Sequence, residues 1–330
     1  MIEISPIERR PTPDGVLRAA KRVAGHVTQT PILPFEWQGK RLWVKAECLQ
    51  ESGSFKLRGA MNRLLRMSEE ERRRGVVAFS SGNHAQGIAI AAQRLDMAAT
   101  IVMPADAPAV KRAATEAAGA KIVEYDRHTE SREAIGARLA EEYGAILVPS
   151  FDDVDIIEGQ GSAGIEIGEQ MRALAGGPPE MVLVCCGGGG LSAGVALALP
   201  DAEIVTVEPD GWDDMARSID AGMPVPVGPN PPRTLCDALQ TPLVSDLTLN
   251  TLRAAGARGI SVTEEEIERA MLFAHRNLRL VVEPGGAVAL AAVLAGKAGK
   301  LPERCVVLVS GGNVDPALYA QILARQAAIA

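Results

Sequence analysis

Short apolar runs alternate with segments of helical spacing along most of the chain. Runs rich in Val, Ile, Leu and Ala predict strands, and most are followed by a segment whose apolar residues recur every three or four positions. The runs occupy residues 76–81, 99–104, 121–126, 145–150, 181–190, 203–209 and 305–313. Strands separated by helices imply parallel crossovers, and continuous apolar strands imply that both faces of the sheet are covered. The pattern predicts an α/β fold.

One region breaks this pattern. Residues 211–248 are rich in Pro and Gly and show no clean period, so we expect a long surface excursion of the kind that often carries function. After Asn313 only one helix-sized segment remains, and we therefore expect no regulatory domain.

Composition limits the classes of function. With 330 residues, 47% hydrophobic and 23% charged, the sequence is typical of a soluble globular protein with one large domain or two ordinary ones. A net charge of −7 argues against nucleic-acid and acidic-membrane partners. No apolar run approaches the roughly 20 residues of a membrane span, and the polar N-terminal segment does not resemble a signal peptide, so we expect a cytoplasmic protein. Five cysteines without CxxC spacing argue against zinc and disulfides.

A single lysine stands among small residues in ESGSFKLRGA, residues 51–60. Lys56 follows a strand-like run at 41–49 and precedes the helical spacing of 61–67. A solvated lysine does not need such surroundings. The sequence therefore favours a lysine that bonds covalently to a cofactor.

A run of four glycines follows the strand that begins at residue 181 and opens a helix. Its backbone amides, reinforced by the positive end of the helix dipole, suit a phosphate group. An alternative remains open at this point. Gly188, Gly190 and Ala193 satisfy the dinucleotide pattern, and Glu208 lies 20 residues after Gly188, so the same stretch is compatible with an NAD-dependent oxidoreductase.

Three further motifs carry candidate chemistry. SSGNHAQG (80–87) joins a strand to a helix, where amides and the side chains of Asn83 and His84 suit a carboxylate; for His84 we favour a structural role over a catalytic base. SGGNVD (310–315) offers a serine hydroxyl beside glycines. The turn from Glu208 to Asp214 presents two carboxylates. These either bind Mg²⁺ or Ca²⁺, which prefer such oxygen ligands, or are solvated acids on the surface.

Taken together and in this order, the motifs resemble one family. The chain is similar to the threonine/serine dehydratase and serine racemase group of pyridoxal-phosphate enzymes, which have fold-type II, the tryptophan-synthase-β-like fold. The resemblance extends from Thr30 to about Asn313, and the oxidoreductase alternative explains only the glycine run. The motifs that carry it are SFKLRGA, SSGNHAQG, GQGSAGIEI, GGGGL, EP…DD, EPGGA and SGGN.

The resemblance implies an architecture. We expect two open, mostly parallel twisted sheets flanked by helices, with a large domain of residues 1–66 and 151–330 and a small domain of residues 67–150. The cofactor would lie in the cleft between them, and closure on the substrate is expected. A homodimer is expected by analogy with the family.

The resemblance also assigns roles. Lys56 would form the Schiff base with the cofactor aldehyde, and its freed amine would remove the Cα proton of the substrate. The other cofactor residues would be Phe55, Asn83 at the ring hydroxyl, Ser310 at the pyridine nitrogen, and Gly187, Gly188, Gly189, Gly190 and Leu191 at the phosphate. The substrate carboxylate would lie on Ser80, Ser81, Gly82, Asn83 and His84. Candidate ligands of Mg²⁺ or Ca²⁺ are Glu208, the carbonyl of Trp212, and Asp214.

These roles predict an L-threonine/L-serine dehydratase, an ammonia-lyase that releases water and then yields a keto acid and ammonia. A neutral Ser310 makes the ring a weaker electron sink, which favours loss of a group from Cβ over a long-lived carbanion. Serine racemase is an alternative, because Ser81 would act on the face of Cα opposite to Lys56. A 3-hydroxyaspartate dehydratase is another, and Arg132 is either the partner of a second substrate carboxylate or, as we favour, a solvated helix residue. A non-catalytic amino-acid or phosphate sensor is the remaining alternative.

Overall fold

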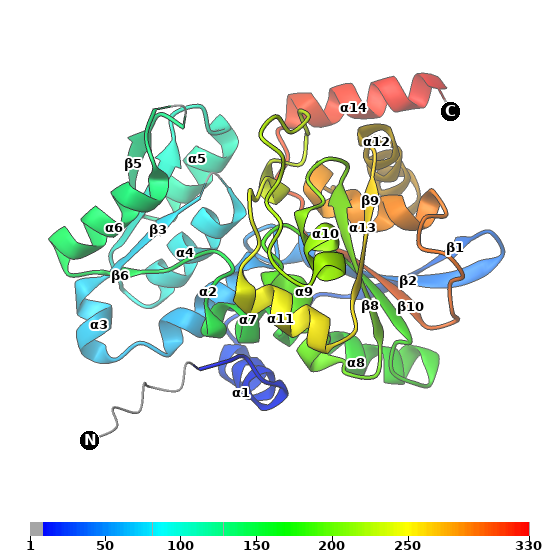
Figure 1. The fold of residues 1–330 in the computed structure, drawn as a ribbon, viewed down its shortest axis with the longest axis horizontal. Helices are drawn as coiled ribbons and strands as arrows, with labels where there is room; N and C mark the ends of the chain where they lie inside the picture. The colour runs from blue at the N-terminus through cyan, green and yellow to red at the C-terminus, as the bar shows by residue number, and fades with distance from the viewer. Residues whose placement is uncertain (1–8, 81, 128, 330) are drawn as a thin grey trace.

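The computed structural model describes residues 9–80, 82–127 and 129–329, and within them the chain forms two sheets flanked by helices (Figure 1). The larger sheet has six strands in the order β1-β2-β10-β7-β8-β9, and the smaller has four in the order β5-β4-β3-β6. Every pair of neighbouring strands is parallel except β1 and β2. The predicted fold class, with two mostly parallel sheets, is confirmed.

The strands of the larger sheet come from both ends of the chain. Its bounds are β1 Ile32–Trp37, β2 Lys40–Ala46, β7 Met181–Cys185, β8 Glu203–Pro209, β9 Arg258–Val262 and β10 Cys305–Val309. The central strand β10 pairs with β2 on one side and β7 on the other, with Val307 opposite both Val44 and Leu183. This pairing brings the lysine loop, the glycine run and the SGGN motif to one edge of the sheet, because each follows the carboxyl end of a neighbouring parallel strand.

The smaller sheet is made of β3 Val76–Phe79, β4 Ala99–Pro104, β5 Lys121–Tyr125 and β6 Ile146–Leu147. Alternate residues of a strand point to opposite faces, and here they pack in two separate clusters. Val76 and Ile101 pack in the cluster that contains Ile88 of α4, whereas Val77 and Val102 pack with residues of α6. Helices α4 and α6 therefore cover opposite faces of this sheet.

Fourteen α-helices connect and cover the strands within the described residues. Helix α13 is buried along almost its whole length and contacts β7, β8 and β10, as expected for a helix that is apolar all round. The helices are α1 Pro13–Val23, α2 Lys56–Leu65, α3 Glu69–Arg74, α4 Asn83–Arg94, α5 Ala109–Ala117, α6 Arg132–Tyr143, α7 Val154–Gln160, α8 Ser162–Ala175, α9 Gly190–Ala198, α10 Asp214–Ala221, α11 Asp246–Ala254, α12 Glu264–Phe273, α13 Pro284–Leu294 and α14 Pro316–Ile329; three short turns of 3₁₀ or π type are η1 Glu47–Leu49, η2 Asp237–Leu239 and η3 Ala274–Leu278.

The structure differs from the sequence prediction in four places. The hairpin of β1 and β2 is antiparallel and turns at Gln38 and Gly39, both with positive φ, and β9 was not among the predicted strands. The region 211–248 is not structureless, because it contains α10 and η2. The strand expected at 145–150 is reduced to the two residues of β6 at the sheet edge.

The domain boundaries at residues 66/67 and 150/151 stay a prediction. The smaller sheet and helices α3 to α6 lie together on the left of Figure 1, beside the larger sheet. In the part of the chain that the structure describes, no helix has the length and apolar character needed to cross a membrane.

Candidate active site

Lys56 is the first residue of α2 and lies at the edge of the larger sheet. The loop before it is tied to the end of β10, because the backbone amide of Phe55 donates to the carbonyl of Ser310 over 3.1 Å and Ser54 forms a β-bridge with Gly311. The half-buried Lys56 side chain donates from Nζ to the carbonyl oxygen of Ser150 at 3.1 Å. Its Nζ also lies 5.1 Å from the centroid of the Phe55 ring.

Burial changes the chemistry of this amine. It lowers the pKa of Lys56 from 10.5 to about 8, and the nearby Cys185 thiol offsets this only in part. Desolvation disfavours the charged form of a lysine, so a much larger share of the amine is neutral near pH 7 than in water. A neutral amine is the form that attacks a carbonyl group or accepts a proton.

The glycine run forms a cradle at the start of α9. Strand β7 ends at Cys185, and α9 begins at Gly190 after Gly189, whose φ of +84° favours glycine. A Cβ on Gly188 would lie 2.2 Å from the ring of Phe151, so the ring packs directly on the glycine backbone. Backbone amides at the start of a nine-residue helix are a ready anion site.

The predicted cofactor residues meet in one enclosed space. Lys56, Asn83 and Ser310 line it together with the glycine run, which comes from a distant part of the chain. The full lining is Phe55, Lys56, Asn83, Ser150, Phe151, Cys185, Gly187, Gly188, Gly189, Gly190, Leu191, Ala238, Leu239, Thr241 and Ser310. The arrangement thus places an amine, an anion cradle and a neutral hydroxyl around the same space.

Asn83 is held on both sides of its amide. Its Nδ2 donates to Glu283 Oε1 at 2.5 Å, and its Oδ1 accepts from Asn313 Nδ2 at 2.8 Å, so the orientation of the group is defined. Burial raises the pKa of Glu283 to about 6, although the ammonium group of Lys111, 3.5 Å away, opposes this. Glu283 is a residue of the EPGGA motif for which the sequence predicted no role.

The SSGNH loop lines a wider pocket of about 430 Å³ that continues from the lysine. Ser80, Gly82, Asn83 and His84 all border it, and Ser80 Oγ accepts from the amide of Gly82 at 3.1 Å. Ser81 lies outside the described residues, so its role as a second acid–base group stays a prediction.

His84 is not suited to act as an acid or base. It is buried, its Nε2 donates to the carbonyl of Val148 at 3.1 Å, and burial lowers its pKa to about 3. A histidine with such a pKa stays neutral at physiological pH. The structure therefore favours the non-catalytic role that we expected from the sequence.

Arg132 was expected to be a solvated helix residue, but the structure places it beside the pocket. It borders the same pocket with its guanidinium 5.5 Å from the centroid of Phe79, and its Nε donates to Glu133 at 2.8 Å. Its side chain is 36% exposed, so it lies at the pocket mouth and is not a fully solvated helix residue. A second carboxylate on a ligand would meet this charge.

The candidate metal residues lie away from this pocket, and two of them are buried. Glu208 accepts with both carboxylate oxygens from the amides of Met215 and Ala216, each at 2.9 Å. Neither side-chain oxygen of Asp214 has a hydrogen-bond partner of normal geometry in the described part of the chain, and burial raises its pKa to about 7. The indole of Trp212 donates to the carbonyl of Pro232 at 2.8 Å.

These findings exclude the interpretation of Glu208 and Asp214 as surface acids, because both are fully buried. An unpaired buried carboxylate is suited to a cation. Among the described residues, no group of three or more His, Cys, Asp and Glu side chains could hold a metal ion, so the two-carboxylate site stays a prediction that depends on backbone carbonyls and water. Glu208 is also poorly placed to bind a ribose, since the start of α10 already occupies its carboxylate.

Sequence reasoning missed part of the lining. Phe151, Cys185 and Thr241 border the cofactor space, and none stands in a motif that points to chemistry. They reach the site only through the packing of β7, η2 and the segment after β6. The Pro/Gly-rich stretch expected to carry function contributes Thr241 to this lining, although the sequence did not specify which of its residues would do so.

Comparison with known proteins agrees with this geometry. A family model described as "Pyridoxal-phosphate dependent enzyme" matches residues 23–311. The chain is 43% identical to L-threo-3-hydroxyaspartate ammonia-lyase from Pseudomonas sp, over 93% of this chain and 97% of that enzyme. Two solved structures superpose closely. Maize serine racemase has a TM-score of 0.86 at 34% identity, covering 97% and 99% of the two chains. Threonine deaminase from T.th. has a TM-score of 0.85 at 40% identity, covering 92% and 99%.

These matches span nearly the whole chain and include the lysine loop, the glycine run and the start of the SGGN motif. They leave the NAD-dependent oxidoreductase without support. The chain belongs to the family of pyridoxal-phosphate-dependent enzymes.

Proposed function

We propose that this enzyme is an ammonia-lyase of β-hydroxy-α-amino acids, of the kind that acts on L-threonine and L-serine. The observation that carries the proposal is the meeting of Lys56, the glycine cradle and Ser310 around one space. The relatives named as ammonia-lyase and deaminase support a carbon–nitrogen lyase.

The residues present fit pyridoxal phosphate. Gly187 to Leu191 would hold its phosphate, Asn83 its ring hydroxyl, and Ser310 its ring nitrogen. When bound, the cofactor supplies an aldehyde that bonds to amines and a ring that withdraws electrons from Cα. The enclosed lining and the amine of Lys56, directed at a carbonyl oxygen, are consistent with this assignment.

Lys56 would act as the base at Cα. Its lowered pKa keeps a useful share of the amine neutral, and the carbonyl of Ser150 would hold the amine in place when it is not covalently bound. Ser310 is neutral and does not force protonation of the ring nitrogen, which favours departure of the β-hydroxyl group. The SSGNH loop would hold the substrate carboxylate through amides at the start of α4.

A second candidate substrate, 3-hydroxyaspartate, is favoured by a specific observation. Arg132 borders the pocket that continues from Lys56, where a β-carboxylate would meet it. The relative with 43% identity carries the name of an enzyme for this substrate. Charge-assisted hydrogen bonds to a carboxylate would distinguish it from threonine and serine.

Three finer features belong to the same proposal. We infer a homodimer by analogy with the family, a cytoplasmic location as expected from the sequence, and a two-domain division at residues 66/67 and 150/151. Light scattering on the purified protein tests the first, cell fractionation the second, and limited proteolysis the third.

The test of the function is product analysis with several substrates in parallel. Purified enzyme is supplied with pyridoxal phosphate and incubated with L-serine, L-threonine or each 3-hydroxyaspartate stereoisomer. Keto acid and ammonia are measured, and the remaining serine is resolved by chirality. Equal amounts of keto acid and ammonia support the proposal. D-serine as the main product would favour the racemase, and binding without turnover would favour a sensor.

A further inference from the structure

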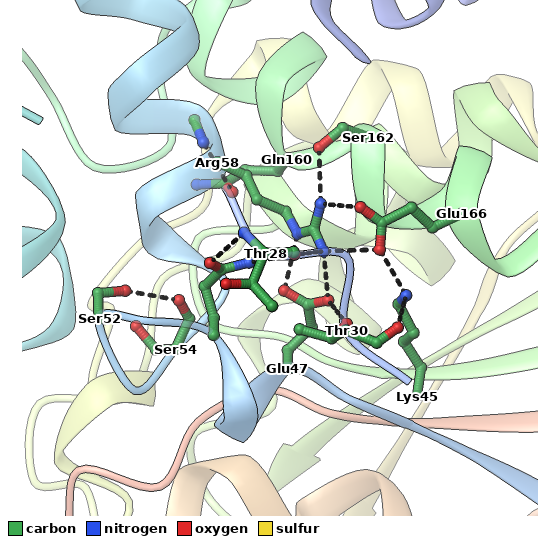
Figure 2. Close-up of polar contacts among 12 residues, drawn as sticks. Thr28, Thr30, Lys45, Glu47, Ser52, Ser54, Arg58, Gln160, Ser162 and Glu166 are labelled. Atoms are coloured by element: carbon green, nitrogen blue, oxygen red, sulfur yellow. Dashed lines mark hydrogen bonds and ion pairs between the residues drawn. The ribbon is translucent and has the colours of Figure 1, made fainter. Parts of the chain in front are cut away.

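A second group of charges lies buried behind the lysine loop, between η1, α2 and α8 (Figure 2). The side chains of Lys45, Glu47 and Arg58 are fully buried, and that of Glu166 is 14% exposed. Two cations and two anions face one another, so the formal charge of the group is balanced. We call these four residues the buried ion cluster. None of them lines the cofactor space.

Arg58 is the centre of the buried ion cluster. It donates hydrogen bonds to Glu47 from Nε and Nη2, both at 2.8 Å. It also donates to Glu166 from Nη1 at 2.6 Å and from Nη2 at 2.8 Å. It also donates to Ser162 Oγ and to the carbonyl of Thr28, each at 3.3 Å. Two bidentate contacts fix the plane of a guanidinium group, which a lysine ammonium could not do.

Lys45 completes the buried ion cluster. Its Nζ donates to Glu166 Oε2 at 2.6 Å, to the carbonyl of Thr30 at 2.7 Å and to Gln170 Oε1 at 3.0 Å. Thr30 Oγ1 also donates to Glu47 Oε1 at 2.5 Å. With the contacts of Arg58, both oxygens of Glu47 and both oxygens of Glu166 therefore accept hydrogen bonds.

The Glu47–Arg58 contact closes the base of the lysine loop. The two residues stand 11 positions apart, and the segment between them carries Phe55 and Lys56. Arg58 lies in the first turn of α2, two residues after Lys56, and the amide of the next residue in that turn donates to Gln160 Oε1 at 3.1 Å. The first turn is thus held from inside by side chains of η1, α7 and α8.

We propose that Arg58 is a positioning residue for Lys56, and that the buried ion cluster fixes the first turn of α2 so that the amine stays in its desolvated place. The inference rests on the proposed function only for the role of Lys56. Arg58 touches neither the cofactor space nor the substrate pocket. It would act through the backbone that it shares with Lys56.

Energetics favour a geometric role over a purely stabilising one. Burying charges is costly, and replacing a buried ion pair by apolar residues is often neutral or stabilising. Four fully paired charges beneath a reactive loop are better explained by the orientation that they impose.

The amine of Lys56 faces few titratable groups. Within the described residues these are Cys185 of β7 and His84 of α4, and the latter stays neutral.

The test compares Arg58→Lys with Arg63→Lys in the apoenzyme. Arg63 is on the same helix and pairs with Asp153 at 3.0 Å, but it lies outside both pockets, so it is a matched control. Lys56 is labelled with limiting acetic anhydride across a pH series, and the peptide that contains it is quantified by mass spectrometry. Circular dichroism verifies that each variant is folded.

We expect the labelling midpoint of Lys56 in R58K to rise by about one pH unit or more toward the ordinary lysine value, because water reaches the amine. Affinity for pyridoxal phosphate should fall by about tenfold in the same variant. R63K should change neither quantity. A folded R58K with unchanged midpoint and affinity would overturn the inference and leave the cluster a structural element.

A second variant covers the case in which R58K does not fold. Glu166→Gln keeps the size of a partly exposed partner and removes one charge, so it should fold and shift the midpoint in the same direction by a smaller amount. An unchanged midpoint in E166Q would also contradict the inference. Failure of the proposed function is a separate result, since it would appear as absence of a covalent cofactor on Lys56 in the wild-type enzyme.

Discussion

Lys56 and Ser150 meet at the edge of the cofactor space: the amine of Lys56 donates to the carbonyl of Ser150 at 3.1 Å. Lys56 begins α2, whereas Ser150 follows β6 of the smaller sheet, so the contact joins the parts of the chain that carry the two sheets. It directs a desolvated amine into the space bordered by the glycine run. Most of the chemistry proposed above depends on this placement.

Burial of Lys56 should cost the apoenzyme stability. Its folded-state pKa of about 8 lies below the ordinary value of 10.5, so the stability present above pH 10.5 is lost as the pH falls toward 8 and stays lost below it. Lys56→Met should therefore raise the free energy of unfolding of the apoenzyme at pH 7 by about 1 to 3 kcal/mol. Urea unfolding at pH 7 and pH 11 measures this.

The control for that experiment is Lys300→Met, since Lys300 is exposed. It should leave the free energy of unfolding nearly unchanged at both pH values. A K56M gain that is equal at pH 7 and pH 11 would mean that hydrophobic packing, and not desolvation of the charge, is responsible.

Gly188→Ala should weaken cofactor binding. The added Cβ would lie 2.2 Å from the Phe151 ring, and that ring borders the cofactor space. Displacing it should cost about 1 to 3 kcal/mol of binding free energy, which corresponds to about 5- to 150-fold in affinity. Fluorescence titration of apoenzyme with pyridoxal phosphate measures the change. Gly228→Ala, where a Cβ would meet no atom within 4 Å, is the matched control.

Arg132→Gln should separate the candidate substrates. If the guanidinium binds a β-carboxylate, the KM for 3-hydroxyaspartate should rise by about 10- to 100-fold, as expected for loss of a charge-assisted hydrogen bond. The KM for L-serine should change little. Steady-state kinetics with both substrates gives the comparison. An equal rise in KM for the two substrates would mean that Arg132 shapes the pocket but does not bind the β-carboxylate.

Asp214→Asn should abolish any stabilisation by divalent cations. Burial raises the pKa of Asp214 to about 7, so the stability present below its ordinary value of 3.8 is lost as the pH rises toward 7. At pH 8, Mg²⁺ or Ca²⁺ should raise the melting temperature of the wild type by offsetting this cost. Calorimetry with and without EDTA tests this; a cation effect that survives in D214N would place the ion elsewhere.

The sequence predicted best what depends on local patterns. Most strands after residue 76, though not β9, the start of α4 and the order of the motifs follow from apolar periodicity and from short motifs such as the one around Lys56. The β1–β2 hairpin was harder, because its two strands lie before the repeating strand–helix pattern and pair antiparallel at the sheet edge.

What the sequence could not provide is long-range packing. We expected Arg132 to be a solvated helix residue, yet its guanidinium lies over the Phe79 ring at the pocket mouth. The acids of the EP…DD turn gave no sign of their burial, which comes from the helix α10 hidden in a Pro/Gly-rich stretch. The partners of Arg58 come from segments up to 108 residues away.

Borohydride reduction of the purified protein, followed by peptide mass spectrometry, tests the role of Lys56 most directly. We expect a yellow protein that bleaches on reduction and carries one pyridoxyl phosphate group on Lys56. A protein that takes up no pyridoxal phosphate, or that carries the reduced group on another lysine, would contradict this role.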